Sequence, residues 1–355
     1  MNFPVFKTKT PGVSERFNLN DPEERKRYFA LKAGGEIAKI KKYLEGGNTF
    51  VGFLLGKKNS GKGTYSKLFM EAVGAEHVGH VSVGDIVRDI HTCVEKGGEE
   101  KDRCFAFLKK NYRGFHGVED LEDLILGRNQ SSLISSELIV ALVKYEISKR
   151  PRKAIFIDGF PRAMDQIGYS LYLKEMIGYR EDPDFLVFIS LPNTVLAERI
   201  KYRVVCPICK VPRNTKLLAT KEVGWDAEKK EFFLMCDNPP CNHTRMVPKE
   251  GDELGIEPIK ARLEADEKIM EELLKLHGIP KVYLRNAVPV SSIAEYVDDY
   301  ELTPGYSYEL EEGGKVKILE TPWTVKDDEG VDSYSLLPPA IVVSMIKQIA
   351  NVLEL

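Results

Sequence analysis

The sequence predicts an α/β fold in which a parallel sheet is flanked by helices. Five short apolar runs, rich in β-branched and aromatic residues, alternate with longer stretches of helical spacing. Such runs are typical of strands buried on both faces, as in a parallel sheet between two layers of helices. The predicted strands are TFVGFLL (49–55), HVGHVSV (77–83), KAIFI (153–157), DFLVFISL (184–191) and IPKVYLRN (279–286).

Composition and charge are those of an ordinary globular protein. The chain has 355 residues, of which 43% are hydrophobic and 30% charged, with a net charge of −3. This balance allows a large core and does not favour nucleic acid or an acidic membrane as a partner. No apolar run approaches the ~20 residues of a membrane span, and the first residues, MNFPVFKTKTPGV, lack the apolar centre of a secretory signal. We therefore expect a soluble, cytoplasmic protein.

The regions outside the strand and helix alternation suggest a division of the chain. A helix is expected after Asn20 or Asp21, either of which can cap it. A hairpin is expected near residue 313, where Gly313 and Gly314 suit a turn. The expected parts are an N-terminal helical extension (1–48), a main domain (49–295), a hairpin-like insertion (296–336) and a C-terminal helix (337–355).

A glycine-rich loop, GKKNSGKGT (56–64), follows the first strand and precedes a helix. Glycines let backbone N–H groups surround phosphate oxygens, and the helix N-terminus adds positive potential. The expected ATP-binding residues are Gly56, Asn59, Ser60, Gly61, Lys62, Gly63 and Thr64, with Lys62 reaching the β- and γ-phosphates. The usual loop has Ser or Thr directly after the lysine, whereas this chain has Gly63 and then Thr64.

Four segments together resemble the adenylate kinase family of nucleoside monophosphate kinases. They are GKGT (61–64), VSVGDIVR (81–88), FIDGFPRAMDQ (156–166) and ERIKYRVVCPIC (198–209), and LISSELIVALV (133–143) resembles the helix that borders the acceptor nucleotide. The resemblance covers residues 49–295 and implies a P-loop NTPase fold with a five-stranded parallel sheet. It also implies an acceptor-binding subdomain (83–145), a mobile lid (204–250) and a monomer that transfers a phosphoryl group from Mg-ATP to a nucleoside monophosphate.

The resemblance also assigns roles to charged residues. Arg88 and Arg162 are expected to bind the α-phosphate of the monophosphate, and Arg262 to bridge both substrates. Arg199 is expected to stack on the ATP base and Arg203 to contact the ATP phosphates. Asp158 is expected to orient water molecules on Mg²⁺. With Lys62, the expected catalytic set is therefore Arg88, Arg162, Arg203, Arg262 and Asp158.

The residues that would contact the acceptor base resemble two different branches of the family. Adenylate members carry Thr or Ser where this chain has Val83, whereas uridylate/cytidylate kinases carry a small apolar residue there. Gln166 fits the adenylate pattern, and Ala163 does not fit the pyrimidine one. We expect AMP, with UMP or CMP as the alternative acceptor. The expected monophosphate-binding residues are Val83, Arg88, Ile134, Gly159, Arg162, Gln166 and Arg262, and Lys249 stands near the place of a lid arginine.

Two cysteine pairs predict a metal site. The sequences CPIC (206–209) and CDNPPC (236–241) have the close spacing of zinc ligands. The expected ligands are Cys206, Cys209, Cys236 and Cys241, with His243 as an alternative to Cys241. A site with four such ligands holds structural Zn²⁺ and has no open position for catalysis.

Two other functional classes fit parts of the sequence. A P-loop ATPase could use a zinc ribbon to contact nucleic acid, but the lid sequence EVGWDAEKKEFFL (222–234) has no basic stripe. No apolar strand is followed by the Asp-Glu pair that a P-loop ATPase uses. An inactive scaffold is the other alternative, and the presence of Lys62, Arg88, Asp158 and Arg162 argues against it. We therefore expect ATP and a monophosphate as partners, and neither nucleic acid nor membrane.

Overall fold

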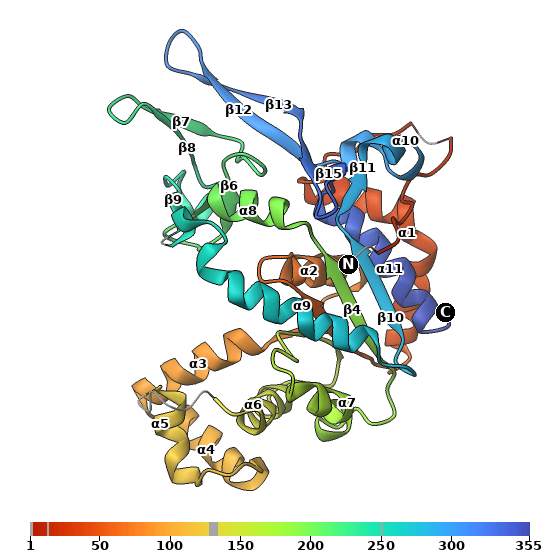
Figure 1. Cartoon of the computed structure of the whole chain (residues 1–355), viewed down its shortest axis with the longest axis vertical. Coiled ribbons are helices and arrows are strands. Elements are labelled where there is room, and N and C mark those ends of the chain that lie inside the picture. Colours follow the sequence, from red (N-terminus) through yellow and green to blue (C-terminus); the bar gives the residue numbers. More distant parts are fainter. Residues whose placement is uncertain (1–2, 13, 128–133, 250) are drawn as a thin grey trace.

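The computed structural model describes residues 3–12, 14–127, 134–249 and 251–355, and its centre is a parallel sheet (Figure 1). The sheet has five strands in the order β10-β4-β1-β3-β2. They are β1 (Val51–Gly56), β2 (Val78–Ser82), β3 (Ala154–Asp158), β4 (Asp184–Ser190) and β10 (Lys281–Arg285), the five predicted strands. The predicted α/β fold with a five-stranded parallel sheet is confirmed.

Strand order brings the polar ends of three strands together. β1 is the central strand, and its neighbour β3 pairs with it so that Leu54 lies opposite Asp158. β2 lies on the other side of β3, with Ser82 opposite Asp158. Because all strands run in one direction, the glycine loop after β1 leaves the sheet at the same edge as Asp158 and Ser82.

Two apolar clusters pack on the two faces of the sheet, since alternate residues of each strand point to opposite sides. Phe50 and Leu54 belong to one cluster, and Val51 and Phe53 to the other. Helices α1 (Pro22–Glu45), α2 (Lys62–Val73) and α11 (Pro338–Val352) cover the first face. Helices α3 (Val83–Lys96), α6 (Ser136–Ser148), α7 (Gln166–Met176) and α9 (Lys260–Leu274) contribute to the second.

Helix α1 is part of the main core. Asp21 caps it by accepting hydrogen bonds from the N–H groups of Glu23 and Glu24, so Asp21 rather than Asn20 is the cap. Its fully buried Ile40 lies in the same cluster as residues of α2 and α11. The segment before the strands therefore stabilises the parallel sheet instead of standing apart from it.

The region between β2 and β3 is an additional layer of helices below the sheet in Figure 1. Ser82 caps α3, and Ser135 caps α6, which corresponds to the predicted helix 133–143. Leu133, where that helix was expected to begin, lies outside the described residues. The remaining helices are α4 (Glu99–Asn111), η1 (Val118–Asp120) and α5 (Leu121–Ile125).

Short strands form the segment between α8 (Asn193–Lys201) and α9. Strands β5 (Arg203–Val205), β6 (Pro212–Asn214) and β9 (Val247–Pro248) form one small sheet, and β7 (Val223–Asp226) and β8 (Glu231–Leu234) form a second. The turns η2 (Pro239–Cys241), η3 (Asp252–Leu254) and η4 (Glu257–Ile259) complete this segment. The helices that flank this segment, α8 and α9, both contact the glycine loop.

Residues 296–336 form a hairpin and a second small sheet. Strands β12 (Pro304–Leu310) and β13 (Val316–Pro322) are antiparallel, and Gly313 and Gly314 both have positive φ in the connecting turn, as the predicted hairpin requires. Strand β15 (Asp332–Ser335) pairs with β11 (Ala287–Pro289) on one side and with β14 (Thr324–Lys326) on the other. The short helices are η5 (Val290–Ser292), α10 (Ile293–Tyr296) and η6 (Asp299–Glu301).

Helix α11 closes the first core cluster and packs between α1 and β10. Ten of its residues are buried, including Met345 and Ile346. None of the helices in the described ranges is long and apolar enough to cross a membrane.

Substitution Ile40→Ala tests whether α1 belongs to the core. The Ile40 side chain is fully buried, so its removal leaves a cavity and should lower the free energy of unfolding by about 2–5 kcal/mol. Denaturant unfolding measures this change. The control Lys39→Ala alters the neighbouring exposed side chain and should change stability by less than about 0.5 kcal/mol. Equal effects of the two variants would contradict the packing of α1.

Candidate active site

A cavity of about 330 Å³ lies at the edge of the sheet where β1, β2 and β3 end. Backbone and side chains of the glycine loop, the ends of two strands and helix α9 surround it. Eight of the residues predicted from the sequence line it: Gly56, Asn59, Lys62, Arg88, Asp158, Gly159, Arg162 and Arg262. Lys58, Ser82, Gly84 and Asp266 also line it and were not predicted.

The glycine loop wraps around the ammonium group of Lys62. Lys62 Nζ donates to the carbonyl oxygens of Gly56 at 2.7 Å and Lys57 at 3.0 Å. Gly61 has φ of 106° and caps α2, where a Cβ atom would lie 2.8 Å from the Tyr65 ring. A side chain at Gly61 is therefore excluded by both conformation and space. Burial lowers the pKa of Lys62.

Asp158 faces Lys62 from the end of β3. Its Oδ1 lies 3.8 Å from Lys62 Nζ, and both side chains are mostly buried. Gly159 follows with φ of 84°, a turn that brings Arg162 back toward the cavity. The loop lysine and the strand-end carboxylate, which were predicted to have separate roles in the site, thus lie next to each other.

Basic groups converge on the cavity from three elements. Burial lowers the pKa of Arg162, and the positive charge of Arg262 lowers it further. Arg262 lies on α9, across the cavity from the strand ends, and Arg88 lies on α3, where it pairs with Asp85. Such a concentration of positive charge around a small cavity is suited to an anion with several charges, such as a chain of phosphates.

Lys58 and Asp266 extend this charged set. The backbone N–H of Lys58 donates to Asp266 Oδ2 at 3.1 Å. Burial and the nearby Arg262, Lys249 and Arg203 lower the pKa of Lys58, in that order. Burial raises the pKa of Asp266. Asp266 stands four positions after Arg262, one helical turn along α9, and that spacing is the signal that could have identified it.

Arg199 of α8 and Arg203 of β5 lie near the glycine loop and the helix that follows it. Arg203 makes a two-pronged ion pair with Asp252, at 2.5 and 2.7 Å, and donates to Asn59 Oδ1 at 3.2 Å. Burial raises the pKa of the Tyr65 hydroxyl, and the nearby positive charge of Arg199 offsets part of that rise. Asp252 was not predicted, because the sequence there departs from the family pattern.

Six other predicted residues do not line the cavity. Val83 is buried in the second apolar cluster, where its Cβ lies 3.7 Å from the position of a Cβ at Gly159. Gln166 is buried at the start of α7, and its Oε1 accepts from the Arg162 N–H at 2.8 Å. The other residues are Ile134, which packs on the same cluster, Ser60 within the glycine loop, and Gly63 and Thr64 in the first turn of α2.

Ser60 has an unusual environment. Its hydroxyl is buried and has no hydrogen-bond partner in the described part of the chain. A Cβ atom at Gly56 would lie 2.8 Å from this hydroxyl, so the glycine is needed to accommodate it. A buried polar group without a partner is costly, and a bound ligand or water molecule is the usual way to satisfy it.

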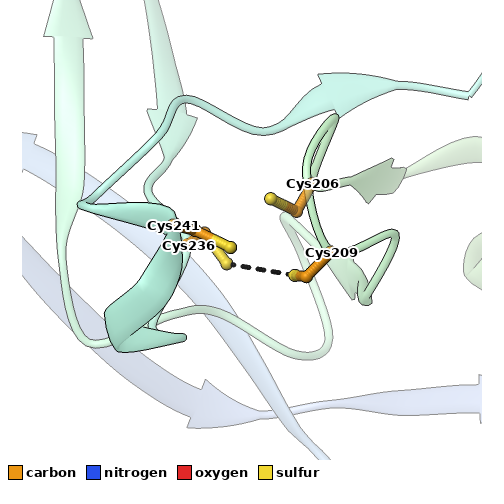
Figure 2. A group of neighbouring side chains, drawn as sticks. All are labelled: Cys206, Cys209, Cys236 and Cys241. Atoms are coloured by element: carbon orange, nitrogen blue, oxygen red, sulfur yellow. Dashed lines mark hydrogen bonds between the residues drawn. The ribbon is translucent and has the colours of Figure 1, made fainter.

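The four cysteines predicted to bind metal form a cluster (Figure 2). The four sulfur atoms all lie within 4.8 Å of one another, and the side chains of Cys206, Cys236 and Cys241 are buried. Cys206 and Cys209 come from one turn, and Cys236 and Cys241 from the turn that faces it in Figure 2. The cluster therefore offers four sulfur ligands from two turns.

Local backbone geometry shapes both cysteine turns. Lys210 has positive φ, and its N–H donates to the Cys206 carbonyl, while the Cys206 N–H donates to Val211. Hydrogen bonding from the Val211 N–H is the main reason that the pKa of Cys209 falls to about 6. Burial raises the pKa of Cys241 to about 12.

His243 is not part of the cluster. It is largely exposed, and its Nδ1 lies 2.8 Å from Glu222. Asn242 and His243 both have positive φ, so the chain turns away from the sulfurs directly after Cys241. The alternative between Cys241 and His243 is decided in favour of Cys241 as the fourth member.

Comparison with known proteins found similar adenylate kinases, although no protein-family profile matches the chain. An adenylate kinase of Hydrogenobaculum sp. is 28% identical over 193 residues, which are 51% of this chain and 78% of that protein. An adenylate kinase of Clostridium acetobutylicum is 27% identical over 242 residues, 68% and 89% of the two chains. An adenylate kinase of Thermotoga neapolitana is 30% identical over 169 residues, 47% and 64%.

These relatives and the geometry agree. The chain spans slightly less than two thirds of the Thermotoga protein and more of the other two. The parallel sheet, the glycine loop with Lys62 and the clustered cysteines are the features that the sequence resemblance predicts. The chain is therefore similar to adenylate kinases over about half to two thirds of its length, and these relatives support its assignment to the adenylate kinase family of phosphotransferases.

Proposed function

We propose that the protein transfers the terminal phosphoryl group of Mg-ATP to AMP, reversibly, to give two ADP. The observation that carries this proposal is the convergence of Lys62, Arg88, Arg162 and Arg262 on one cavity beside the glycine loop. The transferred group carries spread negative charge in the transition state, so catalysis depends on positioning and on opposite charge. No side chain in the cavity needs to act as a covalent intermediate.

On the donor side, the glycine loop and Lys62 bind the ATP phosphates. The N–H groups at the start of α2 point toward them, and the unpartnered Ser60 hydroxyl lies in the same loop. Arg203 reaches the loop through Asn59, which supports its role at the ATP phosphates. In this proposal Arg199 stacks on the ATP base, and the interaction between Arg199 and the Tyr65 hydroxyl holds the arginine in place.

On the acceptor side, Arg88 and Arg162 bind the monophosphate, and a Cβ atom at Gly84 would lie 3.5 Å from the Arg88 guanidinium and 3.9 Å from that of Arg162. The buried position of Val83 supports a packing role for its side chain, so the choice of base rests on other residues. Gln166 is held beside Arg162 by its backbone hydrogen bond, which supports its role at the base. Ile134 and helix α6 border the acceptor subdomain (83–145). We therefore favour AMP over UMP or CMP.

Magnesium fits the donor set of this site. Mg²⁺ takes oxygen ligands and is usually held by one or two carboxylates together with substrate phosphates. Asp158 supplies such a carboxylate at the strand end, beside Lys62. When bound, Mg²⁺ neutralises charge on the phosphates, and Asp158 orients its water shell.

Zinc fits the cysteine cluster. Four sulfur ligands on two facing turns match a closed tetrahedral site, and thiolates bind Zn²⁺ strongly. In this proposal the ion is structural and makes the lid (204–250) move as one body that excludes water from the phosphoryl group. We further propose that the protein is a cytoplasmic monomer with the division 1–48, 49–295, 296–336 and 337–355.

Substitution Lys62→Met tests the phosphate loop. It removes a positive charge that faces the transferred group, and kcat should fall by about 10²–10³-fold. Steady-state kinetics with ATP and AMP measures the change. Lys67→Met alters an exposed lysine of the same helix and should leave kcat unchanged. Near-normal turnover of Lys62→Met would refute the assignment of the loop.

Acceptor preference tests the AMP assignment. In a coupled assay of ADP formation with Mg-ATP, AMP should exceed CMP, UMP, GMP and dTMP by roughly 100-fold or more in kcat/KM, because the site hydrogen-bonds one base. A preference for CMP or UMP would show that the apolar residue at 83 is the better guide to the base. If no monophosphate stimulates turnover, the kinase assignment fails.

Substitution Cys206→Ser tests the structural metal. Loss of one of four ligands should reduce the zinc content and lower the melting temperature before it lowers kcat, since metal binding stabilises the folded lid. Metal analysis and thermal unfolding measure both effects. Cys93→Ser lies outside the cluster and serves as the control. An unchanged melting temperature in Cys206→Ser would count against zinc.

A further inference from the structure

Residues 304–335, named here the brace, contact the glycine loop at one end and the cysteine-bearing segment at the other. The brace comprises strands β12 to β15 (Figure 1). Strand β15 pairs with β11, which directly follows β10 of the main sheet, so this part of the brace is fixed to the core. The hairpin β12–β13 extends from there beside β7 and β8.

The contact between the brace and the glycine loop is centred on Lys57, the second residue of that loop. Its side chain is 6% exposed, and its Nζ lies 2.6 Å from Glu267, 2.8 Å from Asn193 Oδ1 and 3.6 Å from Asp328. These three partners belong to α9, α8 and the turn between β14 and β15. One buried ammonium therefore joins the glycine loop to three elements.

The same turn of the brace also holds the start of α8. Asp328 Oδ1 accepts from the Asn193 N–H at 2.7 Å, and the Lys326 carbonyl accepts from the Thr194 hydroxyl at 2.6 Å. Trp323 and Val325 pack on an apolar cluster shared by α8 and α9. Since α8 and α9 flank the lid, both connections into the lid are held beside the glycine loop.

The turn is preorganised by Asp327. Its buried carboxylate accepts from the N–H groups of Glu329 and Val331, at 3.0 and 2.9 Å, and from the Ser333 hydroxyl. Arg285 of β10 lies 3.7 Å from the same carboxylate. Asp328 is therefore presented to Lys57 by a rigid turn rather than by a loose loop.

At the other end of the brace, the hairpin β12–β13 contacts the lid. The Tyr306 N–H donates to the Lys216 carbonyl at 2.7 Å, and the Tyr308 hydroxyl donates to the Thr215 carbonyl. The Tyr308 ring centroid lies 5.5 Å from that of Phe232, and the ring packs against the cluster that contains the cysteines. Burial raises the pKa of Tyr308 to about 12.

We propose that the brace positions the lid over the glycine loop, with Lys57 as a positioning residue that acts through α8 and α9. The inference rests on the proposed function, because it assumes that 204–250 closes over ATP. A lid attached to the core through a third connection samples fewer open positions, so ATP binding orders fewer groups. Detaching the brace should therefore increase lid motion and raise the KM for ATP more than it changes kcat.

Hydrogen exchange on the nucleotide-free protein tests the brace directly. Tyr308→Ala should increase amide exchange throughout residues 204–249 while leaving the parallel sheet unchanged. Ser307→Ala, on the exposed side of the same strand, is the matched control. Asp328→Ala removes the contact at the other end, away from the cysteines, and should also increase exchange in the lid. No increase in the lid for Asp328→Ala would overturn the proposal.

Kinetics of the same variants provides the second readout. Tyr308→Ala and Asp328→Ala should each raise the KM for ATP roughly fivefold or more. The double variant should show less than the product of the two effects, since both changes interrupt the same connection between the glycine loop and the lid. The KM of Lys57→Arg for ATP should stay closer to the wild-type value than the KM of Lys57→Met. Multiplicative effects in the double variant would overturn the proposal. The exchange result does not depend on activity, so it separates failure of the brace from failure of the kinase assignment.

Discussion

Mutual repulsion among partly buried cations is the constraint on which the site depends. Lys58, Lys62 and Arg162 each have a pKa lowered first by burial, and Arg262 lowers all three further. The protein holds these groups together through rigid backbone: a glycine loop, two strand ends and one face of α9. Asp158 and Asp266 offset part of the repulsion. The remaining positive charge is what makes the cavity suited to polyphosphate.

Local sequence predicted most of the elements that build this cavity. The five apolar runs are the five strands, and Lys62 and Asp158 meet because each follows a strand of the same parallel sheet. Cys206, Cys209 and Cys236 were predictable from spacing alone. In these cases the signal lies within a short stretch of chain, and the parallel sheet brings the stretches together.

Residues that depend on distant contacts were not predictable. The sequence gives no sign that Asp252 and Lys57 differ from ordinary charged side chains, because their partners lie far away in sequence. Val83 follows a strand and starts a helix, so the direction of its side chain is decided by packing in the second core cluster. The choice between Cys241 and His243 was likewise open, because it depends on the positive φ of Asn242.

The pairing of α1 with α11 has a consequence for synthesis. These helices cover the same face of the sheet, yet they lie at opposite ends of the described sequence. A nascent chain on the ribosome must therefore carry α1, β1 and β4 with one apolar face uncovered until residues 338–352 have emerged. Exposed faces of this kind are prone to aggregation. We infer that the apolar core on this face of the sheet is completed only when α11 packs against α1.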